Sequence, residues 1–405
     1  MRKYNLISGF FAALNPCLGL IFSLINFIRL RDSSIVLAFS ISLIAIYFPI
    51  MYDTAVNFYQ SYYSTSYGGV NNWFSLYLYI PSFFMYKFNI DFYFFIFISV
   101  FFVTYTWSKI TFKYVVSATG IFKPVVILIF LLFTFNYRDL MDINRTILSY
   151  SILFYYIFLI KKHNLFKFLF FSFLSFLFHN SALLIILIYL LSLFDFKFKL
   201  NLNFLLIFFS LIIGLFLPKF ITNFQSFIIG MPFFGDGLSY YLYGDDFAIQ
   251  DFTLGTALKK ILNVFIILLT CFLSIFEMRK TPNDKFLQFI VFTGCFCLFF
   301  LGFVTFFERI NLAFNFALIY LLSKNVKSYY LYGLTFLIFI RSIAVYLLIY
   351  FPIFFGDYSL VMVNSDKKND MIYKVLYCPS FYLLDVHNNG YSDQFILSNV
   401  RWGKL

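Results

Sequence analysis

The sequence predicts an all-α, polytopic integral membrane protein, and three observations point to this fold class. Hydrophobic residues make up 62% of the 405 residues and charged residues only 12%, whereas about 25% of the residues of soluble domains are charged. The mean hydropathy is +0.86. The apolar residues also form successive runs that approach the ~20 residues a helix needs to cross a bilayer. We therefore expect about 11 to 12 transmembrane helices.

The predicted spans follow these apolar runs in chain order. The first run begins with MRKYNLISGFF, which resembles a signal peptide in its charge and hydrophobicity. Because no small-residue cleavage site follows it and many further apolar runs do, we interpret it as the first span. The predicted spans are residues 6–28, 34–51, 91–108, 120–136, 145–160, 166–178, 180–194, 201–217, 257–276, 285–305, 310–323 and 329–354.

The basic residues predict the orientation of these spans. Lys and Arg gather in loops that alternation of the spans places on one side, and the positive-inside rule makes that side cytoplasmic. This works only if WFSLYLYIPSFFMYK, residues 73–87, does not cross the membrane. We therefore expect residues 73–87 to form an interfacial or re-entrant helix on the outer face, which Trp, Tyr and Pro tolerate.

The domain organisation follows from this topology. Residues 1–355 are expected to form a single transmembrane domain, with a large outer loop at 218–256, and residues 356–405 a polar C-terminal tail. The long loop contains FFGDGLSYYLYGDDFAIQD. Its tyrosine rings are suited to stack on sugar faces and its carboxylates to accept hydrogen bonds from sugar hydroxyls, which makes Tyr241, Asp245 and Asp246 candidate sugar-binding residues. A solvent-exposed, turn-rich loop is the alternative interpretation.

Charge and cysteine content exclude other classes of partner. The net charge is +12, but the basic residues lie in short loops between apolar runs, so we expect the lipid bilayer and not nucleic acid as the environment. The five cysteines show neither a metal-ligand spacing nor an even disulfide framework. We expect no metal site.

Polar residues converge on the outer ends of several predicted spans. Asp53 follows the second span, Asn144 and Arg145 open a later one, and His179 and Arg309 open two more. Ionisable residues at membrane depth usually serve function. The outer leaflet is therefore the expected location of the functional site.

The cations among these residues suggest the kind of ligand. Arg145, His179 and Arg309 lie near the starts of helices that run inward, where the helix dipole already disfavours positive charge. Asp142 and Glu308 are close enough in sequence to neutralise the two arginines. Taken together, however, three cations at three helix starts favour an anion site, and a lipid phosphate or pyrophosphate is the expected anion.

Three stretches resemble the EpsG-like polysaccharide polymerases. NRTILSYSILFYYIFLIKKHNLFKFLFFSFLSFLFHNSALLIILIYLL is similar to their core, in which an Asn/Arg pair opens one helix and a Phe-His pair follows about 35 residues later. WFSLYLYIPSFFMYKFNIDFYFFIFISVFFVTYTWSKI resembles the preceding segment, and ERINLAFNFALIYLL the later helix that begins with Arg. The resemblance covers roughly residues 50 to 325.

The resemblance implies a Wzy-type O-antigen or capsule polymerase with a GT-C-like glycosyltransferase architecture. Such an enzyme transfers a growing glycan from undecaprenyl pyrophosphate to the next lipid-linked repeat unit, at the periplasmic face of the bacterial inner membrane. The implied partners are the undecaprenyl-pyrophosphate-linked oligosaccharide and a chain-length regulator protein, and no cofactor is implied. An O-antigen ligase, a flippase or transporter for the same lipid-linked sugar, and an O-acyltransferase remain alternatives.

Within this interpretation the residues receive roles. Arg145 and Arg309, with Asn144, are expected to bind the pyrophosphate. Asp53 is the candidate general base, because GT-C-like enzymes, which this chain resembles, commonly hold a catalytic carboxylate in the first outer loop. His179 is the second candidate catalytic residue, expected to hydrogen bond to the phosphate or protonate it, and to stay protonated beside it.

Overall fold

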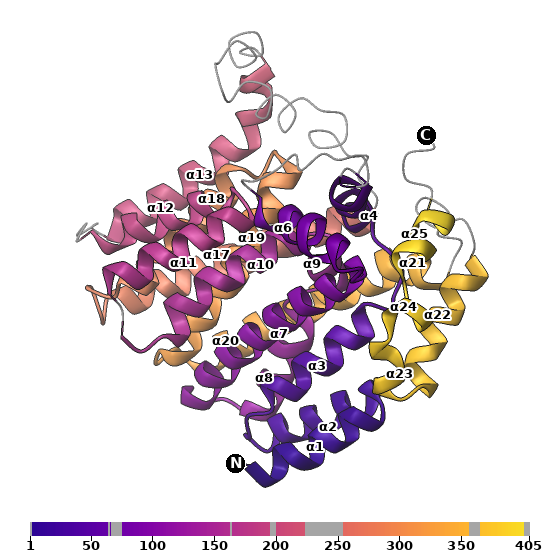
Figure 1. Ribbon diagram of the computed structural model, residues 1–405. Helices are drawn as coiled ribbons and strands as arrows, with labels where there is room; N and C mark the ends of the chain where they lie inside the picture. The colour runs from indigo at the N-terminus through magenta and orange to yellow at the C-terminus, as the bar shows by residue number, and fades with distance from the viewer. Residues whose placement is uncertain are drawn as a thin grey trace. The chain divides into compact units, whose positions relative to one another are not determined.

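The computed structural model describes residues 2–63, 65, 75–162, 164–194, 200–222, 254–355 and 365–400. Throughout these ranges the regular secondary structure is helical, and they contain no β-strand (Figure 1). The predicted all-α class is confirmed.

Four helices in the described ranges are long and apolar enough to cross a membrane. They are α7 (Phe92–Ser117), α17 (Leu254–Met278), α19 (Val304–Ala317) with a 3₁₀ turn that ends at Ser323, and α20 (Ser328–Val345) with its helical continuation to Phe355. At 1.5 Å per residue, the 26 residues of α7 extend about 39 Å, which exceeds the ~30 Å hydrocarbon core of a bilayer. The protein is therefore a polytopic membrane protein, as predicted.

The other predicted spans, apart from the first, also coincide with helices in the described residues. These helices are α3 (Ser34–Ala45), α8 (Lys123–Phe133), α10 (Asn144–Phe154) with a π-helical continuation to Leu159, α11 (Leu165–Phe178), α12 (Ala182–Leu193), α13 (Leu200–Thr222) and α18 (Lys285–Phe299). The segment predicted to lie at the membrane surface forms α6 (Leu76–Tyr79) and a π-helical turn (Ile80–Met85). Together they extend about 15 Å, which is too short to cross a bilayer.

The prediction of one spanning helix at residues 6–28 is wrong. Two helices, α1 (Arg2–Leu14) and α2 (Pro16–Ile28), fold back on each other at Asn15 (Figure 1). Asn15 caps α2 by accepting hydrogen bonds from the backbone N–H groups of Cys17 and Leu18, and Pro16 cannot continue the ladder of α1 because it has no N–H. The backbones approach so closely that a Cβ on Gly19 would lie 2.7 Å from the Cα of Ala12.

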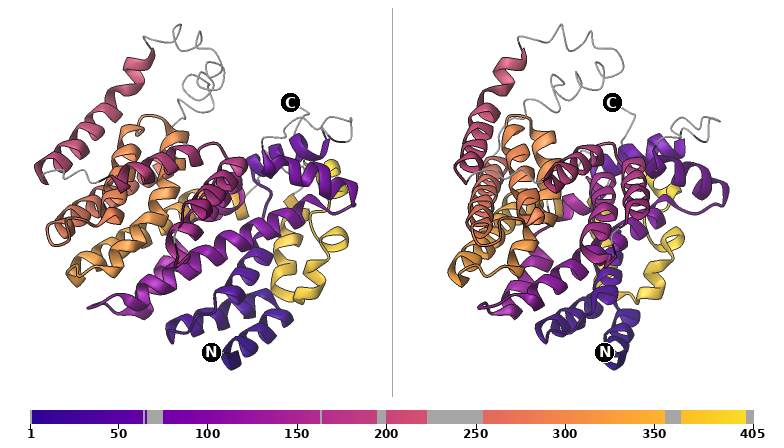
Figure 2. Two further views of the ribbon diagram at one scale, coloured as in Figure 1. Left: turned by 60° about the vertical axis from the view of Figure 1, so that its left-hand side comes forward. Right: turned by 90° about the vertical axis from the view of Figure 1, so that its left-hand side faces the viewer.

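The chain forms two compact units. Unit 1 contains residues 1–116, 122–182 and 346–405, and unit 2 contains residues 117–121 and 183–345. In unit 2, α17, α18 and α19 pack in sequence against one another, and α13 packs against α18 (Figure 2).

The polar tail predicted from residue 356 onward folds back onto unit 1. Its described residues form α22 (Ser365–Tyr377), α23 (Ser380–Leu384), α24 (Val386–Asn389) and α25 (Asp393–Asn399), drawn in yellow beside α1 to α3 in Figure 1. The Asn15 amide donates hydrogen bonds to the carbonyl oxygens of Val375 (3.0 Å) and Cys378 (2.9 Å). The Tyr47 hydroxyl donates to the carbonyl of Leu383 at 2.8 Å. Side chains of the N-terminal helices thus satisfy the backbone of the tail.

Two aspartates join the tail to the start of α7. Asp91 accepts a hydrogen bond from the backbone N–H of Asp393 at 2.9 Å, and Asp393 accepts one from the backbone N–H of Phe92 at 2.9 Å. His387 lies 3.0 Å from the second carboxylate oxygen of Asp91. Each carboxylate therefore caps the other's helix, where the dipole favours negative charge.

Docking of the tail is expected to weaken as the pH rises. Burial, with the neighbouring Asp91 as a smaller cause, raises the pKa of Asp393 from 3.8 to about 7. The docked state therefore binds the proton more tightly than the undocked state, so the stability of docking falls between about pH 4 and pH 7 and changes little above that range. Hydrogen–deuterium exchange of residues 365–400, corrected for intrinsic rates, should be about tenfold faster or more at pH 8 than at pH 5.

Asp393→Asn should remove most of this pH dependence, because its amide oxygen still accepts the hydrogen bond from Phe92 but does not titrate. Asp366→Asn, which changes an exposed acid at the start of α22, is the matched control. Equal protection of the wild-type tail at both pH values would contradict the prediction.

Candidate functional site

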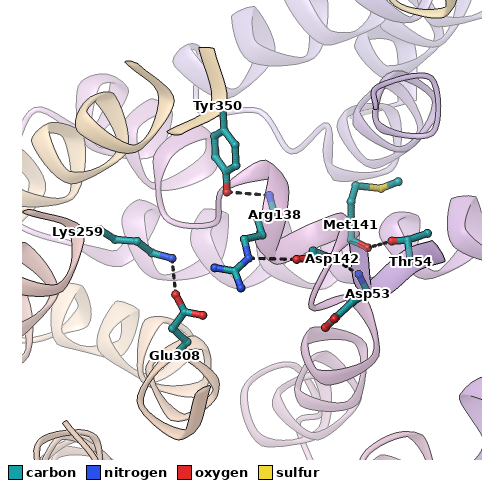
Figure 3. Close-up of polar contacts among 8 residues, drawn as sticks. All are labelled: Asp53, Thr54, Arg138, Met141, Asp142, Lys259, Glu308 and Tyr350. Atoms are coloured by element: carbon teal, nitrogen blue, oxygen red, sulfur yellow. Dashed lines mark hydrogen bonds and ion pairs between the residues drawn. The ribbon is translucent and has the colours of Figure 1, made fainter. Parts of the chain in front are cut away.

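The Asp142 carboxylate joins two helix starts in unit 1. One of its oxygens accepts a hydrogen bond from the backbone N–H of Asp53 at 2.6 Å, and the other accepts from Nε of Arg138 at 3.1 Å (Figure 3). Asp142 is buried, with 7% of its surface exposed. The ion pair of Asp142 is with Arg138, one helical turn earlier, and not with Arg145, the partner that the sequence offered as an alternative.

Arg138 is a site residue that the sequence analysis missed. It lies in α9 (Tyr137–Met141), a short helix that begins with a reciprocal cap between Asn136 and Asp139. The Arg138 backbone N–H donates to the hydroxyl of Tyr350 at 3.0 Å (Figure 3). The signal was present in NYRDLMD, where an Asn with an acidic residue three positions later marks a helix start, and an Arg and an Asp follow at i, i+4 spacing.

Asp53 is positioned through its backbone. It is the second residue of α4 (Tyr52–Phe58), and the carboxylate of Asp142 holds its N–H. The Thr54 hydroxyl donates to the carbonyl oxygen of Met141, which ties the same turn of α4 to α9 (Figure 3). The Asp53 side chain is half-buried. The start of α4 is therefore anchored while its carboxylate remains partly accessible.

Tyr77 brings α6 to the same end of unit 1. It is fully buried, and its hydroxyl has no hydrogen-bond partner among the described residues. The charges of Arg145 and Asp53 both act on this hydroxyl, and α6 packs against α11. Asp53, Arg145 and the start of α6 thus lie at one end of unit 1.

Asn144 and Arg145 begin α10. The Asn144 amide donates to the carbonyl of Leu140 at 2.5 Å, and its Oδ1 has no hydrogen-bond partner among the described residues. Asn144 is 1% exposed. It therefore helps to hold the junction between α9 and α10, and its proposed contact with pyrophosphate stays a prediction.

His179 lies at the corner between α11 and α12. Its Nδ1 accepts a hydrogen bond from the backbone N–H of Ser181 at 3.1 Å and lies 2.7 Å from the Ser181 hydroxyl. The Tyr150 hydroxyl of α10 in turn donates to the Ser181 hydroxyl at 2.9 Å. Ser181 thus holds the ring through Nδ1, and the protonation of His179 beside a phosphate stays a prediction.

In unit 2, the starts of α17 and α19 are joined by an ion pair. Lys259 Nζ lies 2.9 Å from an oxygen of Glu308, and both side chains are largely buried (Figure 3). Arg309 follows Glu308 in the second turn of α19. From the sequence, Glu308 was an alternative partner of Arg309, and Lys259 was overlooked. The signal was LGTALKK, in which two adjacent lysines lie near the start of the predicted span 257–276.

Arg341 is a second residue of unit 2 that the sequence analysis missed. It lies well inside α20 and is 2% exposed. Its Nη1 donates to Oδ1 of Asn263 in α17 at 3.1 Å and lies 3.5 Å from Oδ1 of Asn315 in α19. A buried guanidinium thus cross-links three helices, and an arginine inside the apolar run IFIRSIAV was the available signal.

Two further expectations concern ligands of the site. Tyr241, Asp245 and Asp246, the candidate sugar-binding residues, lie outside the described residues. Within the described ranges, no three His, Cys, Asp or Glu side chains are grouped so that they could hold a metal ion.

Comparison with known families gives one match. The EpsG family matches residues 51–374, and this is a family of Wzy-like, polymerase-type membrane proteins. No curated protein and no solved structure matches the chain. The matched range covers well over half of the chain and includes Asp53, Arg145, His179 and Arg309. The chain therefore belongs to the EpsG family.

Proposed function

We propose that the protein is a repeat-unit polymerase of O-antigen or capsular polysaccharide. It transfers a growing glycan from undecaprenyl pyrophosphate to the next lipid-linked repeat unit at the periplasmic face of the bacterial inner membrane. Membership of the EpsG family supports polymerisation as the class of reaction. Asp53, Arg145 and His179 of unit 1 offer a carboxylate, a guanidinium and an imidazole for this reaction.

The reaction needs one base and one anion site. The bond between the anomeric carbon and the pyrophosphate oxygen breaks, and its electron pair leaves with the pyrophosphate. A hydroxyl oxygen of the acceptor sugar forms the new bond to that carbon, and its proton passes to a base. Cations near the pyrophosphate stabilise the charge that develops on the leaving group.

Asp53 is the best candidate for the base. Both oxygens of Asp142 already accept hydrogen bonds, from Asp53 and from Arg138, and the group is buried. His179 is held through Nδ1 by Ser181, and we assign it a hydrogen bond to a phosphate oxygen and not the role of base. The half-buried carboxylate of Asp53 lies on an anchored helix start, as a general base requires.

The anion site is assigned to Arg145 and Arg309, each in one of the first two turns of an apolar helix. A guanidinium can bind two oxygens of a phosphate at once. The unpaired N–H groups of a helix start add donors to the same ligand. The buried hydroxyl of Tyr77, on which the charge of Arg145 acts, is a further donor in unit 1.

A flippase or transporter of the same lipid-linked sugar is the second candidate. Arg341, Asn263 and Asn315 form a polar cluster inside three helices of unit 2. Polar residues within spanning helices often mark a substrate pathway. The family match favours the polymerase, but this cluster is the feature that a transport function would use.

Deletion of the gene in its native host distinguishes these functions. We expect electrophoresis of the host's lipopolysaccharide or capsule to show a product with a single repeat unit, because transport and attachment continue while polymerisation stops. A product without any repeat unit would indicate a flippase or an O-antigen ligase and would refute the polymerase. Complementation with the wild-type gene should restore the ladder of polymer lengths.

Replacing either arginine should collapse the polymer. A charge-assisted hydrogen bond contributes about 1.5 to 3 kcal/mol, so Arg145→Ala or Arg309→Ala should lower polymer yield about tenfold or more. Arg→Lys should recover only part of the yield, because lysine keeps the charge but loses the two-pronged contact. Polymer ladders, normalised to expression, give the measurement. Arg279→Ala, an exposed arginine just beyond the end of α17, is the control, and full activity of both alanine variants would reject the anion site.

Asp53→Asn should abolish polymerisation while donor binding to the purified protein remains measurable. The amide keeps the shape of the carboxylate but cannot take up the proton, and a general base contributes about 10² to 10⁴-fold to the rate. His179→Gln should retain part of the activity, because the glutamine amide can still donate a hydrogen bond. If Asp53→Asn polymerises normally and His179→Gln or Asp142→Asn is inactive, the base is the residue whose variant failed.

A further inference from the structure

Unit 2 contains an apolar cavity that ends at a lysine. The cavity has a volume of about 450 Å³ and lies between α13 and α17, next to the end of α18. Its lining comprises Leu211, Gly214, Leu215, Lys260, Ile261, Val264, Phe265, Leu301 and Gly302. This volume falls within the usual range of ligand sites, about 300 to 1,000 Å³. Lys260 is the charged residue of this lining.

Two glycines build one wall of this cavity. A Cβ on Gly214 would lie 1.9 Å from the carbonyl oxygen of Leu298, and a Cβ on Gly302 would lie 2.1 Å from Cγ of Pro218. The backbone of α13 is therefore in direct contact with the end of α18 and with the residues after it. Because α13 is held there, a space lined by apolar side chains remains between it and α17.

The charges lie at one end of the cavity. Lys260 and Val264 are four residues apart and so lie on one face of α17, with Lys260 nearer the start of the helix. Lys259 next to it pairs with Glu308, and Arg309 follows in α19. Among Lys259, Lys260, Glu308 and Arg309, positive charge therefore exceeds negative charge at these helix starts.

We propose that this cavity binds the polyprenyl chain of the lipid-linked donor, with Lys260 beside its pyrophosphate. The inference rests on the proposed function, which supplies a donor with an anionic head and a long apolar chain. The cavity offers a cation at the helix starts for the pyrophosphate. It offers an apolar lining farther along α17 for the polyprenyl chain. It also places the head near Arg309, the residue of unit 2 already assigned to the anion site.

A second cavity of unit 2 provides the matched comparison. It has a volume of about 530 Å³, lies among α12, α13 and α18, and is lined by Leu191, Leu206, Ser210, Phe292, Cys295, Phe296 and Phe299. Its lining is apolar, with no charged side chain. It can accept an apolar chain but offers nothing to an anionic head, so charge complementarity selects the cavity that contains Lys260.

The test measures binding directly, in nanodiscs of phosphatidylcholine that contain the full-length protein. Undecaprenyl pyrophosphate with a photoreactive group on its chain is the probe. We expect crosslinks in residues 211–215 and 260–265, abolished by excess unlabelled undecaprenyl pyrophosphate but not by phosphatidylglycerol. Crosslinks that map elsewhere, or equal competition by phosphatidylglycerol, would overturn the proposal.

Variants separate the contribution of the head from that of the chain. Val264→Trp fills the cavity and should weaken probe binding about tenfold or more, whereas Leu206→Trp in the second cavity should not. Lys260→Gln should weaken binding of undecaprenyl pyrophosphate about tenfold but leave binding of undecaprenol unchanged. Lys280→Gln, just beyond the other end of α17, is its control. A larger loss for Leu206→Trp than for Val264→Trp would overturn the assignment.

A cavity variant is informative only if the protein still folds. If Val264→Trp fails to give a single peak in size-exclusion chromatography, Ile261→Trp at the more exposed rim replaces it. Normal binding and polymerisation by the cavity variants would refute the cavity and leave the polymerase function intact. Binding in this cavity by a protein whose deletion does not shorten the polymer would support the cavity and refute the proposed function.

Discussion

The carboxylate of Asp142 is the contact on which the candidate site of unit 1 depends. A buried carboxylate is costly unless its oxygens are hydrogen bonded. Here one oxygen takes the backbone N–H of Asp53 and the other takes the guanidinium of Arg138. The first contact places the start of α4 and the second orients α9, so a single buried charge joins these two helix starts.

The ends of helices carry most of the polar chemistry of both units. In a bilayer, backbone groups inside a helix are satisfied by the helix itself, whereas the first N–H groups need other partners. Acceptor side chains therefore collect at helix starts, as Asp142 does at the start of α4 and Asn15 at the start of α2. Arg341 is different, because the amides of Asn263 and Asn315 bind it well within the helices of unit 2.

The two ends of the chain stabilise each other within unit 1. Asn15 has a double role, since its Oδ1 caps α2 while its amide nitrogen donates to backbone carbonyls in the last turn of α22 and just after it. Asp91 and Asp393 exchange helix caps in a similar way at α7 and α25. The Tyr59 hydroxyl, just after α4, donates to the carbonyl of Val400 at 3.3 Å. The C-terminal helices therefore also brace the helix that carries Asp53.

The sequence by itself determined the helical class, the membrane location and nearly every apolar helix, because hydrophobic run length depends on composition alone. It also identified the helix start at Arg145, because this charge directly precedes an apolar run. It placed Asp53 in a loop, whereas Asp53 lies in the first turn of α4, and it began the helix of Arg309 at residue 310, whereas α19 begins at Val304. The hairpin at Asn15 was visible as well, in an Asn-Pro pair that we interpreted as part of one span.

Tertiary structure alone decided which charges pair. Asp142 binds Arg138 and the backbone of Asp53, although Arg145 lies closer to it in sequence. Glu308 binds Lys259, although Arg309 is the next residue in the chain. Sequence proximity does not determine such pairs. The direction in which a side chain points depends on its position around the helix axis and on which helix packs against that face. The orientation of the His179 ring has the same origin: a backbone N–H two residues later, placed by the turn between α11 and α12, donates to its Nδ1.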